Sequence, residues 1–292
     1  MDRSLAALGL DDVAVERPLI YPGRPVTEPS LLLDDELLPL DVRATRLGDW
    51  TVDRGGRLDE ILTLHGQEPV GRRHPVIAVG SNASPGQVRH KLRRLNLPVF
   101  VPMIPVRVGG IGVGCSGHIS PAGYVAGTPF VDHTADATLV VTWLDARQLK
   151  AVDDTEFPDY RRAILPGEVF DMTMPSDERL SGAYIYFSAH GVLAPDGTRP
   201  LPGGGDQATI LDGLLTGSAR LRELLGSDAA SWVDRAGGDP GTRARGTKIF
   251  GEEGWVLPQT DFLPYLDESA ELLPYDDLPP LAGSLPNRTR NG

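Results

Sequence analysis

The chain has 292 residues, with 40 acidic side chains against 28 lysines and arginines, so its formal net charge at neutral pH is -12. This charge disfavours a nucleic-acid partner, because the phosphates would be repelled. The hydrophobic fraction of 40% is enough for a packed core. No stretch approaches the roughly 20 apolar residues that cross a bilayer. We therefore expect a cytoplasmic protein with neither a membrane nor a nucleic-acid partner.

The composition along the chain predicts three parts. Residues 1–73 form an N-terminal extension, rich in proline and leucine, that is expected to pack on the core. Residues 74–236 form the central domain. Residues 237–292 form a C-terminal extension with an acidic, proline-rich tail, and its last dozen or so residues are expected to be extended or disordered.

The first predicted core strand is residues 75–79, a short run of mostly apolar residues. It leads directly into Gly80, Ser81 and Asn82, which favour a tight turn. The backbone N–H groups of such a turn, followed by a helix N-terminus, form a concave site for carboxylates, phosphates or developing oxyanions. The sequence thus predicts an anion-binding loop here, with a plain turn as the alternative.

A helix is predicted after this turn, up to Arg94. Ser84 suits the N-cap, Pro85 suits the first helical position, and Gln87 completes a capping box. The basic run at residues 89–94 lies on this helix. We interpret that run as a solvated face, with steering of an anionic substrate as the alternative.

A glycine-rich stretch at residues 112–117 matches the spacing of a dinucleotide-binding fingerprint, but no helix pattern follows it. We predict instead a strand where backbones pass closely. The stretch contains Cys115, the single cysteine, which excludes an intrachain disulfide and a thiolate zinc site. A buried thiol is predicted, and a catalytic pair of Cys115 with His118 is the alternative.

An acidic motif follows a predicted strand at residues 137–144. Asp145 and Gln148 form a capping box, so a short helix is expected to begin there. Glu156 then falls at or just past the helix C-terminus, where the helix dipole and nearby aspartates disfavour an ionised carboxylate, while two following arginines favour it. A carboxyl group under such opposed influences can shuttle protons. A solvated acidic loop is the alternative.

The later segments predict a strand, then a group of helices, then irregular chain. A strand is expected at residues 184–187. Cap residues and apolar stripes predict helices at residues 207–215, 219–225 and 229–236. A loop is expected to follow, with short strands or anchors at residues 249–250 and 255–257.

The two motifs together resemble the γ-glutamylcyclotransferase-like superfamily, over roughly residues 74–235. The matching residues are Gly80, Ser81 and Asn82 in the first motif and Asp153, Glu156, Tyr160 and Arg162 in the second. The resemblance implies an α+β fold, with a small, mixed, barrel-like β-sheet flanked by helices. It also implies an enzyme that releases 5-oxoproline and an amine from a γ-glutamyl amide, without a metal or an organic cofactor.

The resemblance assigns roles to these residues. Glu156 would be the catalytic acid and base, and the loop of Gly80, Ser81 and Asn82 would hold the substrate. Tyr160 and Arg162 would support the substrate-binding site.

Three departures from the family pattern concern the pocket wall. Val79 stands where the family usually has tyrosine, and Phe157 stands where many members have glycine. Gln207 is the nearest counterpart of a tyrosine in the last helix, so we expect an amide to replace that phenol in substrate binding. These departures keep open a non-catalytic small-molecule-binding or regulatory protein. A further alternative is an interaction scaffold that uses the terminal extensions, and a homo-oligomer is compatible with the sequence.

Overall fold

The computed structural model describes residues 2–53, 55–267, 269 and 271–281. The strands are β1 (Ser30–Leu33), β2 (Glu36–Asp41), β3 (Thr51–Val52), β4 (His74–Ala78), β5 (Phe100–Ile119), β6 (Val125–Leu144), β7 (Tyr160–Pro166), β8 (Met172–Thr173), β9 (Gly182–Ser188), β10 (Val192–Leu193) and β11 (Val256–Leu257). The α-helices are α1 (Leu5–Leu8), α2 (Leu58–Leu64), α3 (Pro85–Arg94), α4 (Ala146–Glu156), α5 (Gln207–Gly217), α6 (Ala219–Leu225), α7 (Ala229–Gly238) and α8 (Pro240–Glu252).

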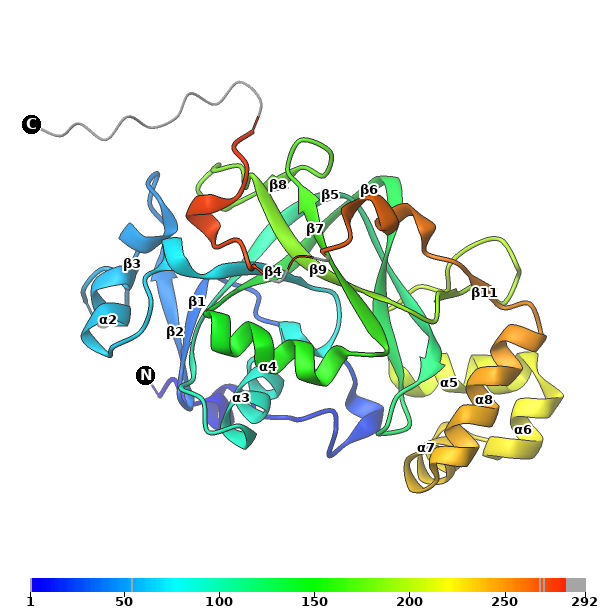
Figure 1. Ribbon diagram of the computed structural model, residues 1–292. Helices are drawn as coiled ribbons and strands as arrows, with labels where there is room; N and C mark the ends of the chain where they lie inside the picture. The colour runs from blue at the N-terminus through cyan, green and yellow to red at the C-terminus, as the bar shows by residue number, and fades with distance from the viewer. Residues whose placement is uncertain (1, 54, 268, 270, 282–292) are drawn as a thin grey trace, which may run out of the picture.

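One mixed sheet organises the molecule, in the order β3-β2-β1-β5-β6-β4-β9-β7. Neighbouring strands are antiparallel except for β4 and β9, which are parallel. The helices α3 and α4 lie together beside the sheet, and α5 to α8 gather at one end of the molecule, far from α2 (Figure 1). The predicted α+β class is confirmed. The predicted barrel-like closure is wrong, because the sheet stays open between its end strands β3 and β7 among the residues described.

The N-terminal region contributes strands to this same sheet. Strand β1 pairs antiparallel with β5, so that Leu31 lies opposite Pro102 and Leu33 opposite Phe100. Leu31 and Leu32 are fully buried, on opposite faces of the sheet, as the alternation of a strand requires. The leucines at residues 31–33 thus belong to a strand of the main sheet. The boundaries of the three predicted parts of the chain, 1–73, 74–236 and 237–292, remain a prediction.

The long hairpin of β5 and β6 explains the glycine-rich stretch. Both strands have 20 residues, and residues 112–117 lie inside β5. A side chain at Gly112 would overlap the Phe130 ring on β6, and one at Gly117 would overlap the backbone of His190. The prediction of a strand with closely passing backbones is therefore confirmed.

The C-terminal helices confirm three predictions and correct one. Helices α5, α6 and α7 begin at the predicted residues, Gln207, Ala219 and Ala229. The loop predicted after them is wrong, because α8 occupies residues 240–252. Asp239 caps this helix by accepting from the N–H groups of residues 241 and 242, and Pro240 takes its first position.

The buried face of α8 includes Ile249 and Phe250, which were predicted as a strand or anchor. Both lie in the core cluster shared with α5, α6 and α7, which is why this segment is helical. Strand β11 lies within the predicted segment 255–257. Residues 282–292, on which the prediction of an extended tail falls, lie outside the described residues.

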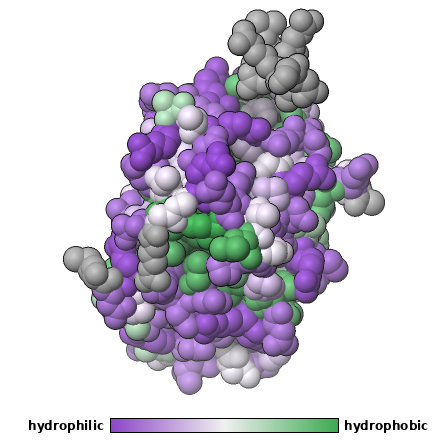
Figure 2. Space-filling model, turned by 90° about the vertical axis from the view of Figure 1, so that its left-hand side faces the viewer, coloured by the Kyte–Doolittle hydropathy of each residue, from purple (hydrophilic) through white to green (hydrophobic). Residues whose placement is uncertain are grey.

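The surface seen from the α2 end is mostly hydrophilic, with hydrophobic side chains gathered near its centre (Figure 2). On α2 itself, Leu64 is 83% exposed, more than the other large hydrophobic side chains described.

None of the helices within the described ranges is both long and apolar enough to cross a membrane.

Candidate active site

The glycine-serine-asparagine turn lies at the end of β4, near the middle of the sheet. The chain passes from β4 through a short 3-10 helix (Ser81–Ala83) into α3, so the predicted strand, turn and helix are all present. The predicted capping box is wrong. Ser84 makes no side-chain cap, and Gln87 turns inward, where it is 5% exposed.

The acidic motif lies on α4, whose last residue is Glu156. Asp145 caps the helix with Gln148 as its partner, as predicted. Asn82 donates to Glu156 Oε1 at 3.1 Å, and Lys91 Nζ lies 2.7 Å from the same oxygen. The two motifs thus meet, although Asn82 and Glu156 are 74 positions apart in the sequence.

The Glu156 carboxylate is held through one oxygen only. Its Oε1 receives both Asn82 and Lys91, whereas Oε2 takes no hydrogen bond within the described ranges. The side chains of Lys91 and Glu156 are only 13% and 15% exposed, so this ion pair is screened little by solvent. The result is an oriented carboxylate with one oxygen left for a ligand.

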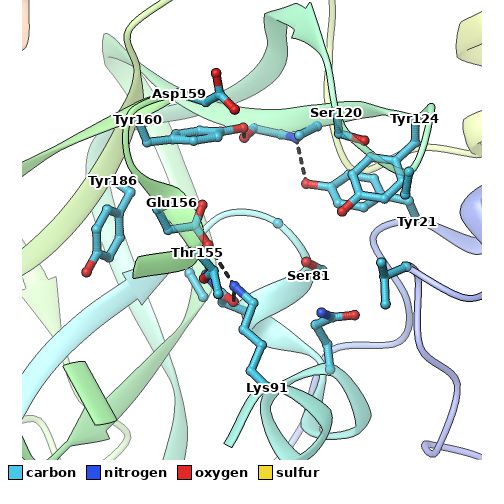
Figure 3. Close-up of a pocket in the computed structure, with 18 of the residues that line it drawn as sticks. Tyr21, Ser81, Lys91, Ser120, Tyr124, Thr155, Glu156, Asp159, Tyr160 and Tyr186 are labelled. Atoms are coloured by element: carbon cyan, nitrogen blue, oxygen red, sulfur yellow. Dashed lines mark hydrogen bonds and ion pairs between the residues drawn. The ribbon is translucent and has the colours of Figure 1, made fainter. Parts of the chain in front are cut away.

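A cavity of about 440 Å³ lies between the two motifs. Of the predicted site residues, five line it: Gly80, Ser81, Asn82, Glu156 and Tyr160. Glu156 and Lys91 point toward each other on one side, and the rings of Tyr160, Tyr124 and Tyr21 surround the space opposite them (Figure 3). This volume falls in the range of small-molecule sites.

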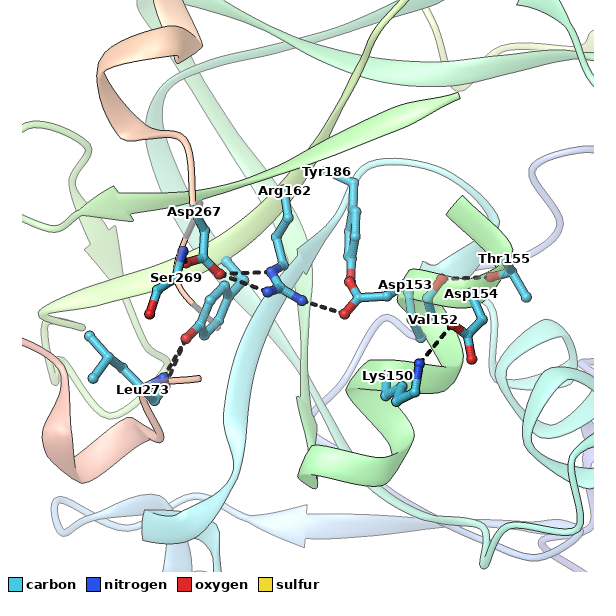
Figure 4. A network of polar contacts seen from close by, with 11 residues as sticks. Lys150, Val152, Asp153, Asp154, Thr155, Arg162, Tyr186, Asp267, Ser269 and Leu273 are labelled. Atoms are coloured by element: carbon cyan, nitrogen blue, oxygen red, sulfur yellow. Dashed lines mark hydrogen bonds and ion pairs between the residues drawn. The ribbon is translucent and has the colours of Figure 1, made fainter. Parts of the chain in front are cut away.

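The other two predicted binding residues lie elsewhere. Arg162 is not in the cavity lining; its guanidinium pairs with Asp153 and, at 2.8 Å, with Asp267 (Figure 4). Gln207, the first residue of α5, is buried against Val125. Its amide hydrogen-bonds the Val125 backbone at 3.1 and 3.2 Å when its oxygen faces the Val125 N–H. The polar atoms of both side chains are therefore paired with other groups of the protein and do not face the cavity.

More phenols line the cavity than Tyr160, the one that the sequence predicted there. Besides Tyr160, the lining includes Tyr21, Tyr124 and Tyr186. Tyr21 and Tyr124 stack with their ring centroids 4.2 Å apart. The expectation that an amide replaces a phenol is corrected: Tyr21 enters from the N-terminal region and Tyr124 from the β5–β6 turn, and neither carries a local motif that would have revealed it.

Two of these phenols hydrogen-bond the backbone of one residue, Gly127. The Gly127 N–H donates to the Tyr21 hydroxyl at 2.6 Å, and the Tyr160 hydroxyl donates to the Gly127 carbonyl at 2.9 Å. Burial raises the pKa of Tyr124 to about 12 and also raises the pKa of Tyr21 and of Tyr160 well above the usual value. All three stay protonated at neutral pH, so they serve the cavity as neutral hydrogen-bonding groups.

The inner face of α3 forms another wall. Gln87, His90, Lys91 and Arg94 all line the cavity, at the spacing of one helix face. The Oε1 atom of Gln87 is buried without a hydrogen-bond partner. Native proteins seldom leave such an atom unpaired, and this one belongs to a residue of the cavity wall.

The basic run on α3 thus divides between two faces. Arg89 and Arg93 pair with Asp35 on the outside, at 2.6 and 2.7 Å. Lys91 and Arg94 face the cavity, and Arg94 makes no ion pair among the residues that the structure describes. The interpretation as a solvated face is wrong for Lys91, whose side chain is 13% exposed, whereas Arg94 lines the cavity and is also exposed to solvent. The charge of both suits a ligand with an anionic group.

The alternative of a catalytic Cys115–His118 pair is not supported by the contacts. The Cys115 thiol is buried, lies 3.5 Å from the Pro202 carbonyl, and has its pKa raised to about 12 by burial. His118 instead lies 2.6 Å from Ser116 Oγ. Within the described ranges, no three histidine, cysteine or acidic side chains are grouped so as to hold a metal ion.

Comparison with known proteins finds no matching family model and no matching curated sequence. Solved structures to which the chain is similar include a γ-glutamyl cyclotransferase, 11% identical, with a TM-score of 0.31 over 68% of this chain and 91% of the other. A yeast γ-glutamyl cyclotransferase specific to glutathione is also 11% identical, with a TM-score of 0.29 over 61% of this chain and 99% of the other.

A third similar structure is a protein of Arabidopsis thaliana, 17% identical, with a TM-score of 0.29 over 39% of this chain. The chain spans 61% of the length of that protein. The structural neighbours therefore include members of the group that the sequence motifs resemble. The TM-scores of all three lie near 0.3.

Proposed function

We propose that the protein cleaves a γ-glutamyl amide, or a closely related amide, by intramolecular cyclisation, with release of 5-oxoproline and an amine. The observation that carries the proposal is the meeting of Glu156 with the 80–82 loop across one cavity. A general acid and base and a set of backbone donors are the two elements that such a reaction needs.

The free oxygen of Glu156 is suited to proton transfer. In the proposed reaction, Oε2 takes a proton from the substrate α-amine, whose nitrogen then attacks the γ-carbonyl carbon. When the C–N bond of the amide breaks, the same carboxyl returns a proton to the departing nitrogen. General acid–base catalysis of this kind contributes about 10²–10⁴-fold to the rate.

The loop would stabilise the charge that develops on the γ-carbonyl oxygen. The N–H groups at residues 80–82 lie at the turn between β4 and α3, beside the helix N-terminus. One oxyanion donor contributes on the order of 10²–10³-fold. Because the ring closure is intramolecular, the substrate itself removes much of the entropy barrier.

The test is 5-oxoproline release from a panel of γ-glutamyl amides, including amino-acid, peptide and alkylamine derivatives. Glu156→Gln keeps the side-chain shape and is expected to lower kcat by about 10²–10⁴-fold. Asp154→Asn, on the exposed side of the same helix, is the matched control and should retain activity. Equal activity of Glu156→Gln and the natural protein would contradict the proposed role.

The Lys91–Glu156 ion pair favours a second candidate, a binding protein without turnover. The Lys91 ammonium group stabilises the charged form of the Glu156 carboxylate, which would have to be protonated during the reaction. In that case γ-glutamyl amides would bind saturably, and no product would form over long incubation. Glu156-dependent product would eliminate this candidate.

A further inference from the structure

A second polar cluster borders the cavity, beside Tyr160, and the proposed reaction does not use it. His118 lies near the end of β5, Asp159 directly before β7, and His190 shortly after β9. His118 and Asp159 both line the cavity. Their ring and carboxylate therefore face the same space as Glu156.

Hydrogen bonds fix the orientation of the His118 ring. Its Nδ1 lies 2.6 Å from Ser116 Oγ, and Ser116 donates in turn to Ser188 Oγ at 2.7 Å. In this network Nδ1 carries the proton, since the Ser116 proton is already donated. The lone pair of Nε2 is thus left without a hydrogen bond within the described part of the chain, on a residue that is only 4% exposed.

The imidazole is neutral under ordinary conditions. Burial lowers the pKa of His118 to about 4, and the opposing charges of Asp159 and Glu156 do not restore it. His190 packs against the ring with 4.8 Å between centroids, and Tyr160 meets it edge-on at 5.7 Å. His118 therefore presents an acceptor to the cavity and no positive charge.

Asp159 presents a second acceptor. Its Oδ1 is 2.9 Å from His190 Nε2, which holds the carboxylate in place. Its Oδ2 lies 4.0 Å from His118 Nε2, too far for a hydrogen bond between them. Two acceptors at this separation can both receive hydrogen bonds of ordinary length from one nitrogen, and one of the acceptors is anionic.

We propose that His118 Nε2 and Asp159 Oδ2 form an ammonium-binding site, which receives the amine that leaves in the proposed reaction. The identity of the amine rests on the proposed function, whereas the binding of an ammonium group does not. A charge-assisted hydrogen bond to the carboxylate and a second bond to the neutral imidazole would select N–H donors over other cations.

The proton balance of cyclisation gives this site a purpose. The substrate α-ammonium carries three protons, and the ring nitrogen of 5-oxoproline keeps one. One of the other two protons is lost to the solvent before the attack, which gives the free α-amine, and Glu156 carries the second to the departing nitrogen. The nitrogen therefore leaves as an amine, which takes up a proton from the solvent at neutral pH and becomes an ammonium ion. The bond from the γ-carbon to the amide nitrogen breaks as the bond to the α-nitrogen forms, and no oxidant or reductant is needed. A site with two acceptors suits that cationic product.

The test uses ethylammonium chloride as the probe on the full chain, labelled with ¹⁵N in its histidines. We expect a saturable shift of the His118 Nε2 resonance. Tetramethylammonium, which has the same charge and no N–H, is expected to leave this resonance unshifted. Asp159→Asn should weaken ethylammonium binding at least about tenfold, and the exposed His133→Gln should leave it unchanged.

Three results would overturn the site: no saturable shift, an equal shift with tetramethylammonium, or unchanged binding in Asp159→Asn. The outcome is separate from that of the proposed function. Ethylammonium binding without turnover of any γ-glutamyl amide would support the site and contradict the reaction. Glu156-dependent turnover without a shift of the His118 resonance by ethylammonium would support the reaction and contradict the site.

Discussion

The hydroxyl oxygen of Tyr21 occupies the space in which a side chain at Gly80 would begin. The backbone at Gly80 has a φ of -138°, which any residue can adopt, so it is this contact that demands glycine. The same hydroxyl accepts from the Gly127 N–H. The N-terminal segment thereby fixes the first residue of the loop that is proposed to hold the substrate.

Gly80→Ala is expected to displace Tyr21 and to lower the free energy of unfolding by about 1–3 kcal/mol, as overpacking does. Tyr21→Phe in the same chain removes the overlapping oxygen, so the double variant should lose less stability than the two single variants added together. Urea denaturation measures all three. Gly213→Ala, where no atom lies within 4 Å of the added Cβ, is the control and should not destabilise. If the losses of stability in the two single variants simply add in the double variant, the proposed contact between Gly80 and Tyr21 is contradicted.

Gln87→Leu is expected to separate binding from stability. The unpaired Oε1 disappears, so the free energy of unfolding should stay unchanged or rise. The affinity for a γ-glutamyl amide that hydrogen-bonds this amide should fall by about 1–3 kcal/mol, which is roughly 5- to 150-fold. Unfolding curves and isothermal titration measure the two effects. Gln87→Glu keeps the shape and one acceptor, and is the companion variant. Unchanged affinity in Gln87→Leu would place the ligand elsewhere.

Arg162→Met is expected to act on stability. The Asp267 side chain is only 2% exposed and that of Asp153 only 16%, so removal of the guanidinium leaves two carboxylates poorly compensated. Breaking such a buried pair costs about 3–5 kcal/mol. The exposed neighbour Arg161→Met is the matched control. A stable Arg162→Met protein that has lost ligand binding would instead support the binding role predicted from the sequence.

Stability is expected to fall as the pH is lowered from about 6.5 toward 4. The pKa of His118 is lowered from 6.5 to about 4 by burial, so the unfolded chain takes up a proton in this window before the folded protein does. Burial also lowers the pKa of His74, which adds to the loss. Urea midpoints at pH 7, 6 and 5 measure the slope.

His118→Asn should reduce this slope and His133→Gln should not. Carboxyl groups such as Asp35, whose pKa is already lowered below 3.8, contribute only at more acidic pH. The slope between pH 6.5 and 4.5 therefore reports on buried histidines. An identical slope in His118→Asn would contradict the neutral, buried ring.

The local elements of this fold could be predicted from the sequence where short-range physics decides them. The Asp145–Gln148 capping box fixes the start of α4, and therefore the place of Glu156 on it. Helix α8 was missed although Asp239 and Pro240 provide a start signal, because the glycines and arginines that follow suggested a loop. The apolar contacts of α8 with the other helices stabilise it as a helix, and these contacts can be seen only in the three-dimensional structure.

The candidate site was predictable only in part, for a related reason. Gly80, Ser81, Asn82 and Glu156 belong to motifs and could be named from the sequence. Tyr21 contacts Gly127 across 106 positions, and no spacing rule connects them. Arg162 follows the motif, but an unforeseen acidic partner, Asp267, lies against it. Side chains whose role depends on distant partners escape prediction from a single sequence.

The placement of Tyr21 also bears on how this pocket can diverge between relatives. A phenol supplied from outside both motifs can be exchanged, moved or deleted while the glycine-serine-asparagine turn and the acidic helix stay intact. Substrate selectivity would then change through substitutions in a segment that a comparison of the two motifs does not include. Sequence changes within the first 30 residues are accordingly where we would search for differences in what related proteins accept.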